Sequence, residues 1–322
     1  MLSWIAAVVA APLLIVQIFL AQASAQSVSI ITTPAGSINN SAGAAIAKVV
    51  TEKAKLRMIV QAQASTGFDE LAAGSGDFNI SNSSDVTFVV TGTGEYEGQG
   101  KKPNLRTIAS MMPYRLALFV RADSDIKTIA DLKGKRVGSG FNAQKTIGRA
   151  IEAYLVNAGL STKDVIGVPT PNVVSQANDF KSGKVDVLFF ALGAAAVKEA
   201  AATVGGLRVL PADDSPEAIS RVQAIVPGNY PLLVNPAPGI DGVTQPTKIL
   251  GIDMVISTND KVSDDIVYRV VKALHESKSD LVATFPPFAL FAPEQMAKPI
   301  KDVAIHPGAE KFYREIGIAP KS

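Results

Sequence analysis

The sequence predicts an α/β fold of two lobes, each built on a mostly parallel sheet flanked by helices. The chain has 322 residues, more than one compact domain usually holds. Beyond the first 25 residues, short apolar runs alternate with segments of helical periodicity, which is typical of parallel strands joined by helices. Apolar residues make up 47% of the chain, enough to bury a sizeable core.

The first 25 residues have the features of a cleavable signal peptide. Residues 5–20 form an apolar run without a charge, and Ala23 and Ala25 fit the two small pockets of a leader peptidase. Cleavage after Ala25 starts the mature chain at Gln26. Because no Lys or Arg precedes the run, and because the run is about as long as the shortest membrane-spanning helices, an uncleaved anchor is the alternative. The small residues at its end favour cleavage and export.

The first part of the mature chain predicts three strand–loop–helix units. Strands are expected where aliphatic residues cluster, at 28–32, 57–62 and 77–80. Each strand is followed by a polar loop of Gly, Ser, Thr and Asn, the first of which covers 33–41. A helix is expected over 42–53, where apolar residues recur at helical spacing.

The second part repeats this alternation. Strands are expected at 116–121, 134–138, 185–190 and 249–257. A capping box at Thr128 and Asp131 predicts a short helix, and a longer helix is expected over 144–158. Ser263 precedes a strongly amphipathic helix. The Pro- and Gly-rich residues 225–247 predict a long irregular connection.

Charge and composition exclude several functions. The formal net charge is only +2, so no nucleic-acid partner is expected. Cysteine is absent, which removes disulfides, thiol nucleophiles and cysteine zinc sites. The two histidines, His275 and His306, have no nucleophile or second ligand near them in the sequence. We therefore expect no catalytic residue, no metal site and no cofactor.

The polar loops after the strands are the candidate binding site. In open α/β sheets ligands lie at the carboxyl ends of strands, where helix N-termini offer unpaired N–H groups. Each loop taken alone is equally typical of an ordinary turn. Together they predict a site in which one lobe contributes Ser37, Asn39, Asn40, Ser65, Thr66, Asn82, Ser83 and Ser84. The other lobe is expected to contribute Ser139, Gln144, Lys145, Thr146 and Tyr230.

Two cations near these loops are candidates for binding an anion. Residues 138–146 resemble a phosphate-binding P-loop, but Gln144 stands where that motif needs Gly, which argues against nucleotide hydrolysis. Lys145 either assists an anionic ligand or lies solvated on the first helical turn. Arg115 either pairs with a ligand carboxylate or is a surface residue of the hinge.

Several stretches resemble a known family. Residues 106–137 are similar to the central block of periplasmic binding proteins of the second structural type. Residues 181–190, 227–230 and 306–317 resemble the TAXI-type substrate-binding subunits of TRAP transporters, and the ending 306–317 is the most specific of them.

The resemblance implies a two-lobe periplasmic receptor without cofactor or ATP hydrolysis. Such a receptor closes around a small organic anion or amino acid and delivers it to integral membrane permease subunits. It implies a first lobe of residues 26–112 and 251–322 and a second of 113–250. Asn39 and Asn40 replace two aromatic residues of the family's first loop, so a different solute is expected. The alternatives are a ligand-binding partner of a membrane sensor and an enzyme that uses the same cleft.

Overall fold

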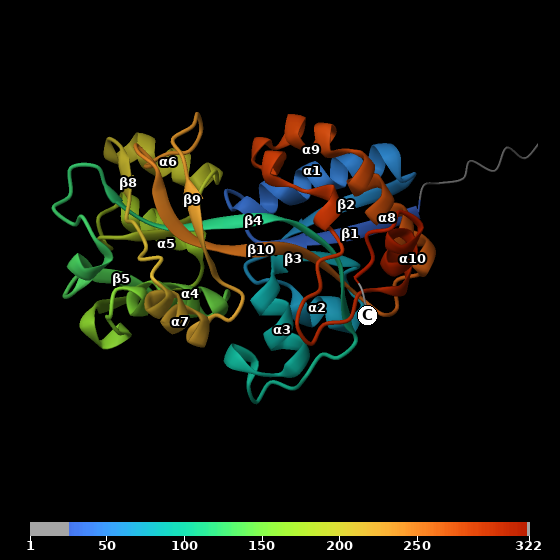
Figure 1. Cartoon of the computed structure of the whole chain (residues 1–322), viewed down its shortest axis with the longest axis horizontal. Coiled ribbons are helices and arrows are strands. Elements are labelled where there is room, and N and C mark those ends of the chain that lie inside the picture. Colours follow the sequence, from blue (N-terminus) through green and yellow to red (C-terminus); the bar gives the residue numbers. More distant parts are fainter. Residues whose placement is uncertain (1–25, 321–322) are drawn as a thin grey trace, which may run out of the picture.

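Two long strands run side by side through the length of the molecule (Figure 1). They are β4 (Leu105–Arg121) and β10 (Thr247–Asn259). The computed structural model describes residues 26–320, and the predicted signal peptide lies outside the described residues. The two strands pair antiparallel, with Leu116 opposite Leu250 and Leu105 opposite Asn259. They therefore connect both ends of the molecule.

The other strands of an eight-stranded sheet are arranged around this pair. The order is β2-β1-β3-β10-β4-β7, with β8 on β4 and β9 on β10. The bounds are β1 (Gln26–Thr32), β2 (Leu56–Ala62), β3 (Phe78–Asn82), β7 (Leu188–Ala191), β8 (Leu207–Val209) and β9 (Tyr230–Val234). A separate two-stranded sheet holds β5 (Arg136–Gly140) and β6 (Ile166–Thr170).

The expected two-lobe α/β class is confirmed, and the sheet is mixed. β1 pairs parallel with β2 and β3, and β5 pairs parallel with β6, as strand–helix–strand units predict. β4 and β10 pair antiparallel with each other and with the other named strands beside them, β3, β7, β8 and β9. The sheet is mixed because the chain passes between its two ends along extended strands, with no helical crossover there.

Helices cover the sheet at both ends. At one end α1 (Ile38–Lys53), α8 (Asp264–Glu276) and α9 (Lys278–Thr284) lie on one face, and α2 (Phe68–Ala73) and α3 (Ser83–Thr91) on the other (Figure 1). The other end holds α4 (Thr146–Asn157), α5 (Val173–Lys181), α6 (Ala195–Val204) and α7 (Pro216–Ile225). Among the helices of residues 26–320, none combines the length and apolar composition that crossing a bilayer requires.

Short helices complete the chain, and α10 closes it. The 3₁₀ turns are η1 (Gly94–Tyr96), η2 (Ile129–Leu132), η3 (Thr162–Asp164), η4 (Pro286–Leu290) and η5 (Pro293–Gln295). The helix α10 (Pro307–Glu315) packs against α8. The capping box predicted at Thr128 and Asp131 is confirmed, since the Asp131 carboxylate accepts a hydrogen bond from the Thr128 N–H at 2.8 Å.

Several elements differ from the sequence prediction. The strand expected at 116–121 is longer, since β4 begins at Leu105, and β6 and β8 were not expected. The first helix begins at Ile38 instead of 42, because the Ser37 hydroxyl caps it by accepting a hydrogen bond from the Asn40 N–H (3.2 Å). The residues 225–247 are not wholly irregular, because they contain β9. Pro231 concealed this strand in the sequence, but β9 pairs only with β10, and an edge strand tolerates proline.

The predicted lobe boundaries at 112 and 250 fall inside β4 and β10. Pro113 lies opposite Asp253, and the register shifts between Asp253 and Val255. Proline has no N–H to donate to the ladder, which accounts for an irregularity at this point. The exact lobe boundaries stay a prediction. The register shift lies close to both of them, at Pro113 and Asp253.

The hydroxyl of Tyr154 fastens α4 to the long strand pair. It donates a hydrogen bond to the carbonyl of Leu116 (2.6 Å) and accepts one from the N–H of Leu250 (2.9 Å). Leu116 and Leu250 face each other in the β4–β10 ladder, so the hydroxyl lies between the two strands. Tyr154 is buried. The orientation of α4 is thereby fixed relative to both strands.

We expect Tyr154→Phe to lower the free energy of unfolding by about 1–3 kcal/mol, because it leaves a buried N–H and a buried carbonyl without their partner. Urea unfolding of the mature chain measures this. Tyr268→Phe is the matched control, since that hydroxyl bonds Glu315 at the surface and its loss should change stability by less than about 0.5 kcal/mol. Equal effects of the two variants would contradict the role assigned to Tyr154.

Candidate functional site

A cavity of about 90 Å³ lies in the middle of the molecule, where α1, α3, α4, β4 and β7 meet. A single water needs about 10–15 Å³, so the cavity is large enough for a small organic molecule. One part of its wall is polar and comes from the strand ends near α1 and α3. The other part is apolar and includes Leu116, Ile147, Phe189, Phe190 and Ile252.

The loop between β1 and α1 supplies the first polar group of side chains. The Thr33 hydroxyl donates to the Ser37 hydroxyl oxygen (2.8 Å), and Ser37 in turn caps α1. Asn39, on the first turn of α1, donates through Nδ2 to the carbonyl of Ile80 (3.2 Å). The preceding Gly36 has φ +90°, which a residue with a side chain rarely adopts, so the turn depends on glycine. This loop is therefore fixed before any ligand arrives.

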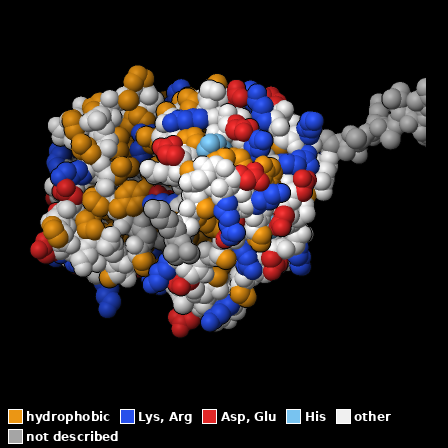
Figure 2. Space-filling model, turned by 45° about the vertical axis from the view of Figure 1, so that its right-hand side comes forward, with side chains coloured by type: hydrophobic (Ala, Val, Ile, Leu, Met, Phe, Trp, Pro, Cys, Tyr) orange, Lys and Arg blue, Asp and Glu red, His pale blue; other side chains and the backbone are white. Residues whose placement is uncertain are grey.

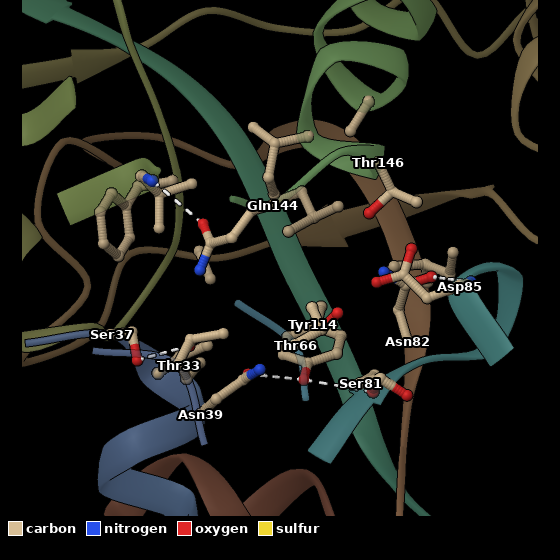
Figure 3. A pocket seen from close by; sticks show the side chains of 18 of the residues that line it. Thr33, Ser37, Asn39, Thr66, Ser81, Asn82, Asp85, Tyr114, Gln144 and Thr146 are labelled. Carbon is tan, nitrogen blue, oxygen red and sulfur yellow. Dashed lines mark hydrogen bonds between the residues drawn. The ribbon is translucent and has the colours of Figure 1, made fainter. Parts of the chain in front are cut away.

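Tyr114 links this loop to the end of β3. Its hydroxyl donates to Asn39 Oδ1 (2.7 Å) and lies 3.3 Å from the carbonyl oxygen of Ser81 (Figure 3). Burial raises the pKa of Tyr114 well above its usual value, and the nearby Asp85 acts in the same direction. The phenol is therefore neutral. The hydroxyl of Ser81 has no hydrogen-bond partner among the described residues, although it is buried in the wall.

Asp85 is the single acidic residue of the wall. It lies on the first turn of α3, where Asn82 Oδ1 caps the helix by accepting from the N–H groups of Ser84 (3.0 Å) and Asp85 (2.9 Å). Asp85 is 3% exposed, and its carboxyl group lies next to the side chain of Thr146 in the cavity wall (Figure 3). Within residues 26–320, no hydrogen-bond partner reaches Asp85 Oδ1. The carboxyl group of Asp85 thus has unused acceptor capacity in the wall of the cavity.

Burial raises the pKa of Asp85 to about 7, because desolvation disfavours the charged carboxylate. Polar contact with the side chains of Thr146 and Asn82 acts in the opposite direction, and the negative charge of Glu95 raises the pKa further. Near neutral pH the group is therefore present in both protonation states. Small changes in its surroundings shift it between them.

Gln144 closes the cavity on the side of α4. Its Oε1 accepts a hydrogen bond from the N–H of Val173 (3.1 Å), and its amide nitrogen points into the cavity (Figure 3). The wall thus offers hydroxyl, amide and carboxyl groups to a solute. The described lining contains no lysine, arginine or histidine. Across residues 26–320, no group of three His, Asp or Glu side chains is placed to hold a metal ion.

The structure brings six of the residues predicted from the sequence together in this cavity. They come from both predicted lobes, and they are Ser37, Asn39, Thr66, Asn82, Gln144 and Thr146. Their contact with a solute stays a prediction.

Four residues predicted to bind the solute lie outside the lining of the cavity. Three come from the first lobe and one from β9. Asn40 turns away from the cavity and donates to the Thr32 hydroxyl (3.1 Å). The hydroxyls of Ser83 and Ser84 face the backbone of Gly228. Tyr230 donates to Asp253 Oδ1 (2.9 Å). Asn40 and Tyr230 thus use their polar groups within the protein, and Ser83 and Ser84 face a neighbouring loop.

Three more of these residues line neighbouring grooves. Ser65 accepts from the N–H of Gly67 (3.3 Å) beside the groove next to Tyr96. Ser139 faces Gly167 on the adjacent strand. Lys145 bonds the side chain of Gln99, and its ammonium lies 5.6 Å from the ring centre of Tyr96.

Arg115 also lies outside the lining. Its neighbours Tyr114 and Leu116 both face the cavity, and side chains alternate along a strand, so Arg115 points to the opposite face of the sheet. There its guanidinium approaches Gly193, whose Cβ, if present, would lie 3.8 Å from Arg115 Nη2. The arginine is therefore placed at the junction of the two halves, away from the solute.

Sequence reasoning missed Thr33, Ser81, Asp85 and Tyr114, together with the apolar wall. Ser81 and Asp85 belong to the polar stretch that ends the third predicted strand, so strand-end position was a usable signal for them. Tyr114 lies inside a strand, where only knowledge of the pairing shows which face it takes.

The chain belongs to the NMT1-like family, which residues 30–317 match. Several solved structures share the fold. MatC from Rhodopseudomonas palustris with bound malate is 12% identical, with 91% of this chain and 98% of that chain covered and a TM-score of 0.60. The alkanesulfonate-binding protein SsuA from Xanthomonas axonopodis pv. citri bound to MOPS is 14% identical, with 92% and 94% of the two chains covered and a TM-score of 0.50. An ancestral arginine-binding protein bound to arginine is 16% identical, with 82% and 97% of the two chains covered and a TM-score of 0.50.

We expect Asp85 to contribute a loss of stability as pH rises between about 4 and 7, and Asp85→Asn to remove this contribution. In that range the folded Asp85 holds a proton that the unfolded chain, with a carboxyl pKa near 3.9, has released. The loss contributed by this group is at most about 1.4 kcal/mol per pH unit. Urea unfolding of both proteins at several pH values measures it. Parallel stability curves for the two proteins would contradict the raised pKa.

Proposed function

We propose that this member of the NMT1-like family is a periplasmic solute-binding protein that encloses one small polar organic molecule and delivers it to a membrane permease. The observation that supports this most directly is the central cavity, whose wall joins residues from both predicted lobes. Ser81 and Asp85 each leave a buried oxygen there without a partner. Buried polar groups are usually paired, so these atoms favour a bound ligand as the missing partner.

The charge of the solute does not follow from the fold. The proteins that share this architecture were solved with malate, with MOPS and with arginine, which differ in charge. The sequence favoured an organic anion, but the lining holds no basic side chain that would balance its charge. We therefore propose a small polar solute and do not carry over its anionic character.

The residues that line the cavity favour binding of a solute over its chemical conversion. His275 and His306 lie in and before helices outside the lining, so no histidine of the described residues adjoins the cavity hydroxyls. The capping hydroxyl of Ser37 contacts Thr33 and the Asn40 N–H, and no contact activates it as a nucleophile. A receptor that returns its ligand unchanged accounts for these residues better than an enzyme does.

The finer assignment is the TAXI type of receptor, which serves a TRAP permease driven by an ion gradient. It rests on the resemblance of residues 181–190, 227–230 and 306–317. Vesicles that contain the permease should then accumulate the solute only when this protein and an ion gradient are present. Uptake that needs ATP would replace this assignment with another transporter type and leave the solute-binding role intact.

The binding role predicts that some small solute stabilises the mature chain and is released unchanged. A panel of organic acids, amino acids, amines, amidines and phosphonates is screened by thermal shift. A ligand at 100 times its dissociation constant adds about 2.7 kcal/mol of stability. Ala150→Phe should abolish the shift, because Ala150 lines the cavity and the larger ring fills it.

Ala202→Phe serves as the matched control, since it places the same ring on the exposed face of α6 and should leave binding unchanged. Conversion of the bound solute to a product, or binding that survives Ala150→Phe, would overturn the proposal.

A further inference from the structure

We propose that Asp85 makes the cavity selective for a small solute with a cationic N–H group, such as an amidinium or an ammonium, and against anions. The inference rests on the proposed binding function and names its solute class. It replaces the anionic solute that the sequence resemblance implies.

The first argument is the unused acceptor. Asp85 is 3% exposed, and its Oδ1 has no hydrogen-bond partner within residues 26–320. Leaving a buried acceptor unpaired costs stability, and the cost is higher for a charged group. The carboxyl group lies in the cavity wall next to Thr146, so a solute in the cavity can donate a hydrogen bond to it (Figure 3).

The second argument is the lack of a counterion for Asp85. The ionisable groups whose charge is coupled to that of Asp85 are Glu95 and Tyr96 of η1 and Tyr114 of β4, and none of them is a cation. The cations on the neighbouring start of α4 are Lys145, which precedes the helix, and Arg149. Both cations are directed elsewhere: Arg149 bonds the carboxylate of Glu95, and Lys145 bonds Gln99. A buried carboxylate normally has a paired charge, and here the solute is the group left to provide it.

The third argument is the shape and character of the opposite wall. Leu116, Phe189 and Phe190 offer apolar surface across the cavity from the polar strand ends. A solute with a planar cationic head and an apolar body fits both parts. An anion would lie in a buried site beside a carboxylate and without a cation, an arrangement in which like charges repel strongly.

The pH dependence of binding follows from the ionisation of Asp85. With a pKa of about 7, the free protein carries the carboxylate in about nine molecules in ten at pH 8 and in about one in ten at pH 6. A cation binds the carboxylate form, so its apparent affinity falls about 10-fold between pH 8 and pH 6. An anion would show the opposite dependence, because it needs Asp85 protonated.

Three planar molecules of nearly equal size separate charge from shape: benzamidine, benzamide and benzoate. Calorimetric titration of the mature chain at pH 8 should give the tightest binding for benzamidine, weaker binding for benzamide and the weakest for benzoate. Benzamidine should bind about 10-fold more weakly at pH 6. This comparison uses the unaltered protein and does not depend on whether any variant folds.

Asp85→Asn should weaken benzamidine binding about 10–100-fold and remove its pH dependence, because the amide retains the shape without the charge. Asp265→Asn, which removes an exposed carboxylate on α8, should leave binding unchanged.

Benzoate binding as tight as benzamidine, no binding of benzamidine, or an Asp85→Asn variant that binds it normally would each overturn the selectivity. If an organic acid binds and benzamidine does not, the receptor function stands and this inference falls. If no compound of the wider panel binds, the receptor function fails as well.

Discussion

The antiparallel pairing of β4 with β10 is the constraint on which the remaining structure depends. Both strands extend from one end of the molecule to the other. The strands near either end therefore take their positions from the hydrogen bonds between β4 and β10. The Tyr154 hydroxyl adds a helix to it, since it bonds a carbonyl of one strand and an N–H of the other. The cavity lies beside this pair, and its wall therefore keeps its geometry only while the pair is intact.

Two side chains of the cavity wall, Asp85 and Ser81, keep buried oxygens without a hydrogen-bond partner among the described residues. Tyr114 of the same wall is paired with Asn39, and further unpaired buried atoms lie outside the wall, for example in Asn79 and Thr107. Such groups reduce stability, and proteins retain them where binding recovers the cost. Figure 2 shows that charged side chains of both signs are intermixed on this face of the molecule.

The ending 306–317, the most specific motif of the sequence, stabilises the packing of the fold. His306 is 1% exposed and caps α10, since its Nδ1 accepts from the Gly308 N–H (3.2 Å) and its Nε2 lies 3.0 Å from the Val262 carbonyl. Gly308 lets α10 approach α8, because a Cβ there would lie 2.3 Å from the carbonyl oxygen of Asp264. The ending therefore supports a family assignment through packing, and it carries no information about the solute.

The sequence by itself determined the α/β class, most strands and helices, and the strand-end rule that placed Ser37, Asn82 and Thr146 at the cavity, because hydrophobic periodicity and capping residues are local properties. It did not determine which face of β4 meets the cavity, that the Pro-rich 225–247 contains β9, or that Lys145 and Arg115 point away. Only the tertiary structure decided these, because they depend on strand register and on burial. For the same reason the charge of the site depends on Asp85, whose pKa is set by desolvation that no local pattern records.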